Sequence, residues 1–200
     1  MTDNKKTPDI RFQGFTDAWE LRKLGELYDK NTERNDELIG YDKTITIATM
    51  NYKDEGNGAS LDSLANYKVL RLGDIAFEGH TNKEFRFGRF VVNDLGTGVM
   101  SPRFTALRPL NETSISFWKY YFRQELVMRN ILANSTKAGT MMNELVINEF
   151  LDQKIATPSR EEQELIGEYL VKLDALITLH QRKCEKLKKV KSAMLERMFV

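Results

Sequence analysis

The stretch from His80 to Arg103 combines basic, amide and aromatic side chains, and it is the part of the sequence best suited to binding a ligand. Basic residues outnumber acidic ones by five to two between Lys83 and Arg108, although the whole chain has a formal net charge of only +1. Basic and amide groups contact the phosphates and base edges of nucleic acids. The residues of this stretch that are predicted to contact DNA are His80, Asn82, Lys83, Arg86, Arg89 and Arg103.

Aromatic residues are interleaved with these polar groups. Alternation along a strand would place the rings in the core and the polar groups on the outside. A second polar stretch, residues 134–140, is expected to join helical segments, and its Lys137 and Thr140 are able to make similar contacts. The alternatives are an ordinary solvated sheet face for the first stretch and a plain linker for the second. The interleaved aromatic residues are Phe85, Phe87, Phe90 and Phe104.

Residues that could perform catalysis are few. Asp74, Glu78 and Lys83 would suit a small magnesium-dependent nuclease, but any acidic turn followed by a lysine produces this combination by chance. His180 and Cys184 fall on the apolar face of a long helix, which argues against a Cys-His catalytic pair. One cysteine and two histidines are too few ligands for a structural zinc site. The sequence therefore predicts no catalytic residue and no metal in this chain.

Length and composition exclude further classes of protein. The 200 residues are 41% hydrophobic, and no run of about 18 apolar residues is present to span a bilayer. The polar start Met1–Lys6 does not resemble a signal peptide, and a single cysteine supports no disulfide framework, so a cytoplasmic location is expected. Gly56-Asn57-Gly58 is not followed by a credible helix, so no cofactor-binding glycine loop is predicted.

The elements that must position these residues fall into two parts. Residues 1–158 hold short strand-like and helical stretches, which predicts an α+β domain with a twisted, partly closed sheet and flanking helices. A short helix is expected over Trp19–Tyr28, and a longer one over Ser116–Leu132 with Leu126 in the core. Strands are expected at Thr44–Ile47, Tyr67–Leu72, Ile75–Phe77, Phe85–Val92 and Arg103–Leu107.

Residues 159–200 are predicted to form one long helix, because this segment has no proline and only one glycine. Ser159 is expected to cap the helix, with Glu162 reaching back to complete a capping box. Ten positions follow the alternating spacing of four and three residues that is typical of a coiled-coil seam, and eight of them are apolar. These positions are Ile166, Leu170, Leu173, Ile177, His180, Cys184, Leu187, Lys191, Met194 and Met198.

A helix of this length outruns a domain of about 155 residues, so we expect it to project and to need a partner helix. Residues 160–178 carry two basic and five acidic side chains, whereas residues 179–200 carry seven basic and two acidic ones. This asymmetry favours antiparallel pairing with a similar helix. A solvated helix whose charges match its own dipole explains the same signs without a partner.

Three groups of residues form motifs that occur together in one order. The first is Pro8–Phe15 with Trp19 and Lys23–Glu26, and the second is Gly73-Asp74-Ile75 with Phe77. The third lies at the entry to the helix and along it, at Ile155, Pro158, Glu161–Gln163, Ile166, Leu173–Ile177, His180–Lys183, Leu187–Lys189 and Met198-Phe199. With these motifs the chain resembles, over nearly its whole length, the specificity (S) subunit of type I restriction-modification enzymes. The first group is similar to the opening of a target recognition domain, the second to a strand turn of that domain, and the third to the family's spacer helix.

The resemblance implies a DNA-reading, non-catalytic adaptor with a target recognition domain at residues 1–158 and a spacer or dimerisation helix at residues 159–200. Methyltransferase (M) subunits, which would bind S-adenosylmethionine, and a restriction (R) subunit are its implied partners. The usual subunit has two recognition domains and two spacer helices, so this chain resembles one half. The implied homodimer forms an antiparallel coiled coil through Ile166, Leu170, Leu173, Ile177, His180, Cys184, Leu187, Met194 and Met198.

Two other functions stay open on the residues alone. One is the small magnesium-dependent nuclease. The other is a coiled-coil interaction protein without affinity for DNA. A divalent-ion-dependent cleavage assay and a salt-dependent DNA titration distinguish them from the adaptor.

Overall fold

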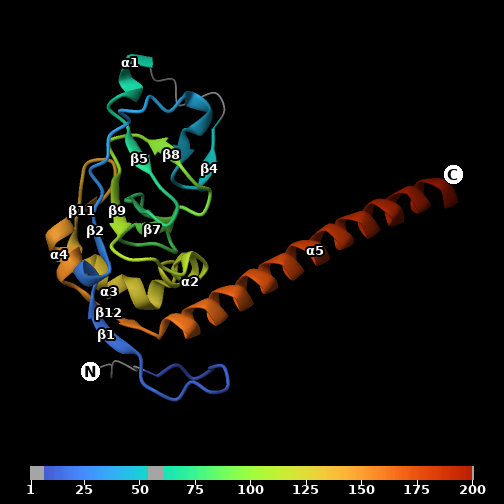
Figure 1. Cartoon of the computed structure of the whole chain (residues 1–200). Coiled ribbons are helices and arrows are strands. Elements are labelled where there is room, and N and C mark those ends of the chain that lie inside the picture. Colours follow the sequence, from blue (N-terminus) through green and yellow to red (C-terminus); the bar gives the residue numbers. More distant parts are fainter. Residues whose placement is uncertain (1–6, 54–60, 200) are drawn as a thin grey trace.

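The computed structural model describes residues 7–53 and 61–199, arranged as an α+β domain from which one long helix projects (Figure 1). The polar start at residues 1–6 and the Gly56-Asn57-Gly58 segment lie outside the described residues. Within the described residues, no helix is long and apolar enough to cross a membrane.

A four-stranded antiparallel sheet runs through the domain in the order β2-β9-β6-β7. Phe77 on β6 pairs with Phe90 on one side and with Thr105 on the other. The outer strands β2 and β7 do not pair with each other, so the sheet stays open. The four strands are β2 (Tyr28–Lys30), β6 (Ile75–Glu78), β7 (Arg89–Val92) and β9 (Thr105–Pro109).

Shorter pairs of strands surround this sheet. The pair β3-β4 lies with β5-β8 and the one-turn helix α1 at one end of the domain, and β1-β12 lies at the other end beside the start of the long helix (Figure 1). The pair β10-β11 closes a turn at residues 138–143. Their bounds are β1 (Glu20–Lys23), β3 (Ile45–Thr46), β4 (Asn51–Tyr52), α1 (Leu61–Leu64), β5 (Lys68–Leu70), β8 (Gly98–Met100), β10 (Thr136–Lys137), β11 (Glu144–Leu145) and β12 (Lys154–Thr157).

Alternation along the strands separates two hydrophobic clusters. Ile75 and Phe77 on β6 join the larger cluster with the helices, whereas Ala76 between them joins a smaller cluster beside β3 and β8. Phe90 and Phe150 pack in the larger cluster with their ring centroids 4.6 Å apart. The helical elements are α2 (Ile115–Tyr121), α3 (Glu125–Ser135) and α4 (Ile147–Asp152), with 3-10 turns η1 (Leu24–Glu26) and η2 (Tyr41–Lys43).

The long helix α5 extends over Arg160–Met198, as the sequence predicts, and has 39 residues. Ser159 caps it, since its hydroxyl accepts a hydrogen bond from the Glu162 backbone N–H at 3.3 Å. The first turns cross α2 at Gly167, where a Cβ atom would lie 2.3 Å from the Ser116 hydroxyl and 2.7 Å from the Phe117 nitrogen. Only glycine permits so close a crossing.

Two sequence predictions about helices are wrong. Trp19–Tyr28 is not a helix: it contains β1, the 3-10 turn η1 and the start of β2. The reason is long-range pairing, because β1 forms an antiparallel ladder with β12, in which Arg22 faces Ile155. The predicted helix at 116–132 is interrupted between α2 and α3, and Leu126 is 95% exposed rather than in the core.

The predicted strands all occur, although their bounds differ from the stretches that indicate them. β3, β5, β6, β7 and β9 each overlap one of the five predicted strand stretches. Residues 134–140 are not a simple loop between helices, since they contain the end of α3 and strand β10.

Candidate nucleic-acid interface

Backbone contacts bring the loop after β6 against the turn between β10 and β11. The Asn143 N–H donates to the Gly79 carbonyl oxygen at 2.9 Å. A Cβ atom at Gly79 would lie 1.9 Å from the Asn143 carbonyl oxygen, so this approach requires glycine. The loop that carries His80 therefore starts directly beside the turn that follows Lys137.

A third turn, residues 101–104 before β9, joins the same region. Arg103 Nη2 lies 3.8 Å from the Met141 sulfur, across the gap between the two turns. A cavity of about 480 Å³ lies between them. The structure thus brings together Arg103 and Thr140, which come from the two polar stretches that the sequence singled out. The cavity is lined by Phe77, Arg103, Phe104, Thr105, Thr140, Met141, Met142, Asn143, Glu144 and Leu145.

The aromatic residues of the first stretch face inward, as predicted. Phe85 and Phe90 are buried, while Phe87 and Phe104 are partly buried and pack against the two hydrophobic clusters. Their burial leaves the interleaved polar groups at or near the surface, which is the consequence of strand alternation.

Two of the predicted contact residues already have firm partners within the chain. Arg89 donates from Nε to Glu78 Oε2 at 2.7 Å and from Nη2 to the Ala48 carbonyl oxygen at 2.7 Å. The Asn82 side-chain oxygen accepts from the backbone N–H groups of Glu84 and Phe85, each at 2.8 Å, and so shapes its own turn. Both side chains therefore hold the loop between β6 and β7, which also carries His80, Lys83 and Arg86.

The other predicted residues present their side chains to solvent. The His80 Nδ1 atom lies 3.8 Å from Glu78 Oε1, and the Arg86 guanidinium lies 5.8 Å from the centroid of the Phe87 ring. Contact of any of these residues with DNA stays a prediction. These residues, all of them exposed, are His80, Lys83, Arg86, Arg103, Lys137 and Thr140.

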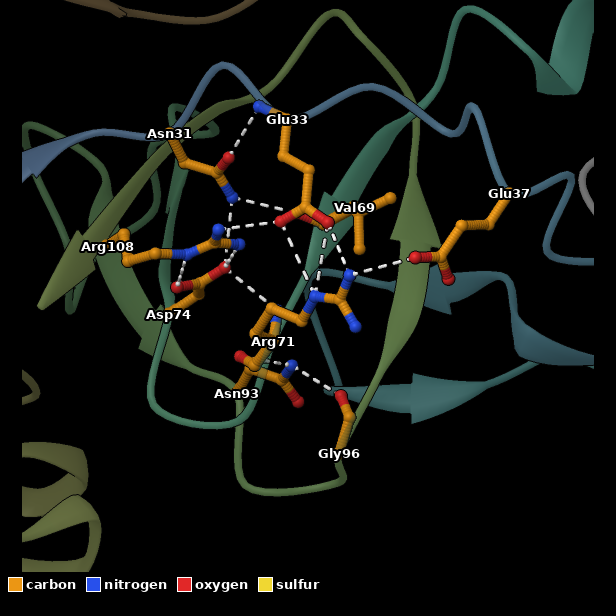
Figure 2. A network of polar contacts seen from close by, with 9 residues as sticks. All are labelled: Asn31, Glu33, Glu37, Val69, Arg71, Asp74, Asn93, Gly96 and Arg108. Atoms are coloured by element: carbon orange, nitrogen blue, oxygen red, sulfur yellow. Dashed lines mark hydrogen bonds and ion pairs between the residues drawn. The ribbon is translucent and has the colours of Figure 1, made fainter.

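Asp74, which the nuclease alternative requires, lies in a network of polar side chains that Figure 2 shows. Its side chain is 1% exposed and accepts from Arg108 Nε at 2.9 Å and Nη2 at 2.8 Å. The amide of Asn31 and the backbone N–H of Arg71 also donate to it, at 2.9 and 2.8 Å. A carboxylate with this many donors is a structural anchor of the turn before β6.

Glu33 extends the network between two arginines (Figure 2). Arg71 Nη2 lies 2.6 Å from Glu33 Oε1, and Arg108 Nη1 lies 2.6 Å from Glu33 Oε2. The hydrogen bond from Arg71, helped by Arg108, lowers the pKa of Glu33 below its ordinary value. The pKa of Arg108 is raised, mainly by its hydrogen bonds to Asp74 and further by its hydrogen bond to Glu33.

The described residues contain no group of three or more histidine, cysteine, aspartate or glutamate side chains that could hold a metal ion. Asp74 precedes β6 and Glu78 ends it, and each carboxylate is bound by an arginine, Arg108 and Arg89 respectively. The three residues of the nuclease alternative therefore do not form one site.

The opening motif of the chain binds the start of α5. Glu162 is 1% exposed and accepts from Arg11 Nε at 2.8 Å, from Arg11 Nη2 at 2.7 Å and from the Trp19 indole N–H at 3.1 Å. The hydrogen bond to Glu162 raises the pKa of Arg11. Glu162 therefore does not complete the predicted capping box, because its carboxylate is bound to the N-terminal segment instead.

The family model described as "Type I restriction modification DNA specificity domain" matches residues 16–189. The chain belongs to this family. Its fold is similar to that of the HsdS subunit from Thermoanaerobacter tengcongensis in a crystal structure, with a TM-score of 0.59 and 21% sequence identity. The similarity covers 90% of this chain and 48% of the HsdS chain, so this chain spans about half the length of that relative. No curated protein matches the sequence.

The match to the specificity domain extends into α5. The first residues of its apolar seam pack against the domain, and the later ones are exposed to solvent. Ile166 packs against the larger hydrophobic cluster, and Leu170 is also partly buried. Farther along, Ile177 is 53% exposed and Leu187 is 60% exposed. All described residues from Val171 to Phe199 are exposed, including His180 and Cys184.

The acidic first half of α5 is engaged within the chain. Asp174 accepts from the Tyr120 hydroxyl at 2.7 Å, and Glu162 binds Arg11. Glu164 and Glu168 form surface pairs with Arg160 and Lys172, and Glu161 contacts Ser159. The charge asymmetry along α5 is consequently weaker support for antiparallel pairing than the sequence indicates.

The sequence alone does not identify most of the residues that line the cavity beside Arg103, among them Met141, Asn143 and Glu144. Their only sequence signal is that they directly follow the polar stretch 134–140. Their relation to Arg103 depends on pairing of β10 with β11 and on the contact with Gly79, neither of which is visible in a local pattern.

Proposed function

We propose that this specificity domain reads a short DNA half-site as the non-catalytic recognition subunit of a type I restriction-modification complex. The observation that supports it most is that the turns at 101–104 and 139–143 line one cavity, while the loop at 79–88 is bound to the second turn through the Asn143 N–H and the Gly79 carbonyl oxygen. Exposed basic side chains on these turns or beside them suit phosphate contacts, and the cavity offers polar groups to base edges. Residues 1–158 form the recognition part in this proposal.

The chemistry is supplied by partners. Methyl transfer requires a methyltransferase subunit that binds S-adenosylmethionine, and cleavage requires a restriction subunit. This chain supplies the DNA sequence preference and a docking surface for the methyltransferase, in the cytoplasm where the DNA lies.

The helix at 159–200 pairs with the same helix of a second copy, in antiparallel orientation. The argument rests on the apolar seam, which is exposed from Leu173 onward, rather than on the charge asymmetry. A two-fold pair would read an inverted repeat, and the helix length would set the distance between the half-sites.

Methylation mapping tests this function directly. Genomic DNA from cells that carry this chain and its methyltransferase partner should contain one two-part methylated motif, which disappears when the chain is deleted. Substituting Arg86, Arg103 and Lys137 together by alanine should abolish or alter the motif. A charge-matched triple, Lys23, Arg129 and Lys154 to alanine, changes exposed residues elsewhere and should leave the motif unchanged.

Three results would contradict the proposal. Methylation that persists without the chain would show that another protein selects the site. DNA cleavage by the purified chain with magnesium would favour the nuclease. Absence of salt-dependent DNA binding, together with dimerisation, would favour the interaction protein without DNA affinity.

A further inference from the structure

The arginines of this domain differ in what their guanidinium groups contact. Arg11, Arg71, Arg89 and Arg108 each bind a carboxylate at 2.6 to 2.8 Å. Arg103 is exposed, and its guanidinium contacts the Met141 thioether at 3.8 Å. A thioether is a weak acceptor, so this contact positions the guanidinium without neutralising it.

We propose that the cavity between the turns at 101–104 and 139–143 receives the edge of one base pair and that Arg103 recognises a guanine there. This inference rests on the proposed function of DNA reading, and it assigns base contact to one residue among the exposed polar set.

The shape and chemistry of the cavity favour a base edge over a phosphate. Its volume is about 480 Å³, and Phe77 and Leu145 give it apolar walls. Asn143 and Glu144 line the same cavity and add an amide and a carboxylate. Glutamate would repel a phosphate, whereas asparagine and glutamate hydrogen-bond to base edges.

Arginine suits guanine because its two terminal donors match the O6 and N7 acceptors in the major groove. The turn at 139–143, which forms the wall of the cavity opposite Arg103, is held in place because the Asn143 N–H is bound to the Gly79 carbonyl oxygen. A wall that is already ordered before binding adds little entropic cost, which favours a discriminating contact. Lys83, Arg86 and Lys137 are exposed and do not line this cavity, so they are assigned to phosphates.

Replacement of single guanines by 7-deazaguanine tests the assignment, since this base lacks the N7 acceptor. The full chain with its methyltransferase partner is titrated with a duplex that carries the methylated motif, and each guanine is replaced in turn. We expect one position in each half-site at which the affinity of the parent falls about tenfold. Arg103→Ala should bind the normal duplex about tenfold or more weakly, and it should no longer respond to 7-deazaguanine at that position.

Two variants separate base contact from charge. Arg103→Lys keeps the charge but not the paired donors, so it should keep affinity for a scrambled duplex and lose the preference for the motif. Arg86→Ala should weaken binding to every duplex alike and reduce the slope of log affinity against log salt by about 0.9 for each copy of the chain that is bound.

The inference is overturned if Arg103→Ala still responds to every 7-deazaguanine as the parent does, if it weakens scrambled and specific duplexes equally, or if the motif contains no guanine. A parent complex that does not distinguish motif from scrambled DNA would instead refute the proposed function, and this inference with it.

Discussion

Two buried carboxylates organise the chain at the scale of single residues. Asp74 and Glu162 are each about 1% exposed, and each is held by the paired donors of an arginine, Arg108 and Arg11. A buried charge is tolerated only when it is paired and hydrogen-bonded. Both carboxylates lie in motifs that the family resemblance rests on, and the contacts of these two side chains maintain the fold.

Asp74→Ala is expected to lower the free energy of unfolding by about 3 kcal/mol or more, because Arg108 and Asn31 lose their buried partner. Urea denaturation measures the change. Asp152→Ala is the matched control, since Asp152 pairs with Lys23 at 3.0 Å on the surface and its removal should cost less than about 1 kcal/mol. Equal losses in the two variants would show that the network in Figure 2 contributes no more than a surface pair.

Glu33 makes stability depend on pH. Its pKa is lowered from the ordinary 4.5 by Arg71 and Arg108, so the stability it contributes is present above pH 4.5 and is lost as pH falls through the lowered pKa. Glu33→Gln should therefore be less stable than the parent at pH 7, and the difference should narrow toward pH 3. Urea unfolding at both pH values measures it, with the exposed Glu84→Gln as control. A difference that widens on acidification would reverse the sign of this linkage.

At the scale of elements, the crossing of α2 and α5 joins the domain to its projecting helix. Gly167 allows the two backbones to approach, and the Tyr120 hydroxyl donates to Asp174 two turns later. Burial, followed by this hydrogen bond to a carboxylate, raises the pKa of Tyr120 to about 12. The direction of α5 is therefore set by contacts between its first half and α2.

Gly167→Ala tests this crossing against helix propensity. Alanine is favoured over glycine in a helix interior by about 1 kcal/mol, so without the crossing the variant would be more stable. We expect a loss of about 1 to 3 kcal/mol instead, because the new methyl group meets Ser116 and Phe117. Thermal or urea unfolding shows whether the free energy of unfolding falls or rises. Thr178→Ala, in the exposed part of α5, should change stability by less than about 0.5 kcal/mol.

At the scale of the whole molecule, α5 projects far beyond the domain (Figure 1). The 39 residues of α5 span about 58 Å at 1.5 Å per residue, and its described residues from Val171 onward are exposed. An isolated helix in water gains little stability from propensity, and tertiary packing supplies most of it. This supports the proposal that the far half of α5 packs against a second copy of the chain.

Substituting Ile177 and Leu187 by aspartate is expected to give monomers, because each would place a charge in the apolar seam at a cost of several kcal/mol. Both residues are more than half exposed in the single chain, so the domain itself should stay folded. Sedimentation measures the oligomeric state. Val171 and Leu179 to aspartate is the control, since these exposed residues lie off the seam. A dimer that survives the first pair of substitutions would place the interface elsewhere.

Insertion of one heptad between Leu173 and Leu187 tests the spacing role. Seven residues keep the seam in register and lengthen the helix by about 10.5 Å, which corresponds to roughly three base pairs at about 3.4 Å each. The half-sites should stay the same while the gap between them grows by about three base pairs. Methylation mapping measures the half-site sequences and the gap between them in one experiment. An active complex that keeps the original gap would show that α5 does not set the spacing.

Local patterns were enough to predict the long helix, its Ser159 cap, the approximate strands and the burial of Phe85 and Phe90. Each depends on periodicity or capping among residues a few positions apart, and such signals are contained in a short window of sequence. The order of motifs was likewise enough to indicate the specificity family.

Only the tertiary structure shows which residues far apart in the sequence contact one another. Trp19–Tyr28 has apolar spacing that favours a helix, yet pairing with β12 makes its first part a strand. Glu162 has the position of a capping-box residue, yet Arg11, 151 residues away, takes its carboxylate. The cavity beside Arg103 exists only because β10-β11 and Gly79 bring the turn at 139–143 to it. The physical reason is that a local preference amounts to about 1 kcal/mol or less per residue, whereas the contributions of cross-strand pairs add up along a ladder and a buried carboxylate without its partner costs about 3 to 5 kcal/mol. The long-range contacts therefore prevail.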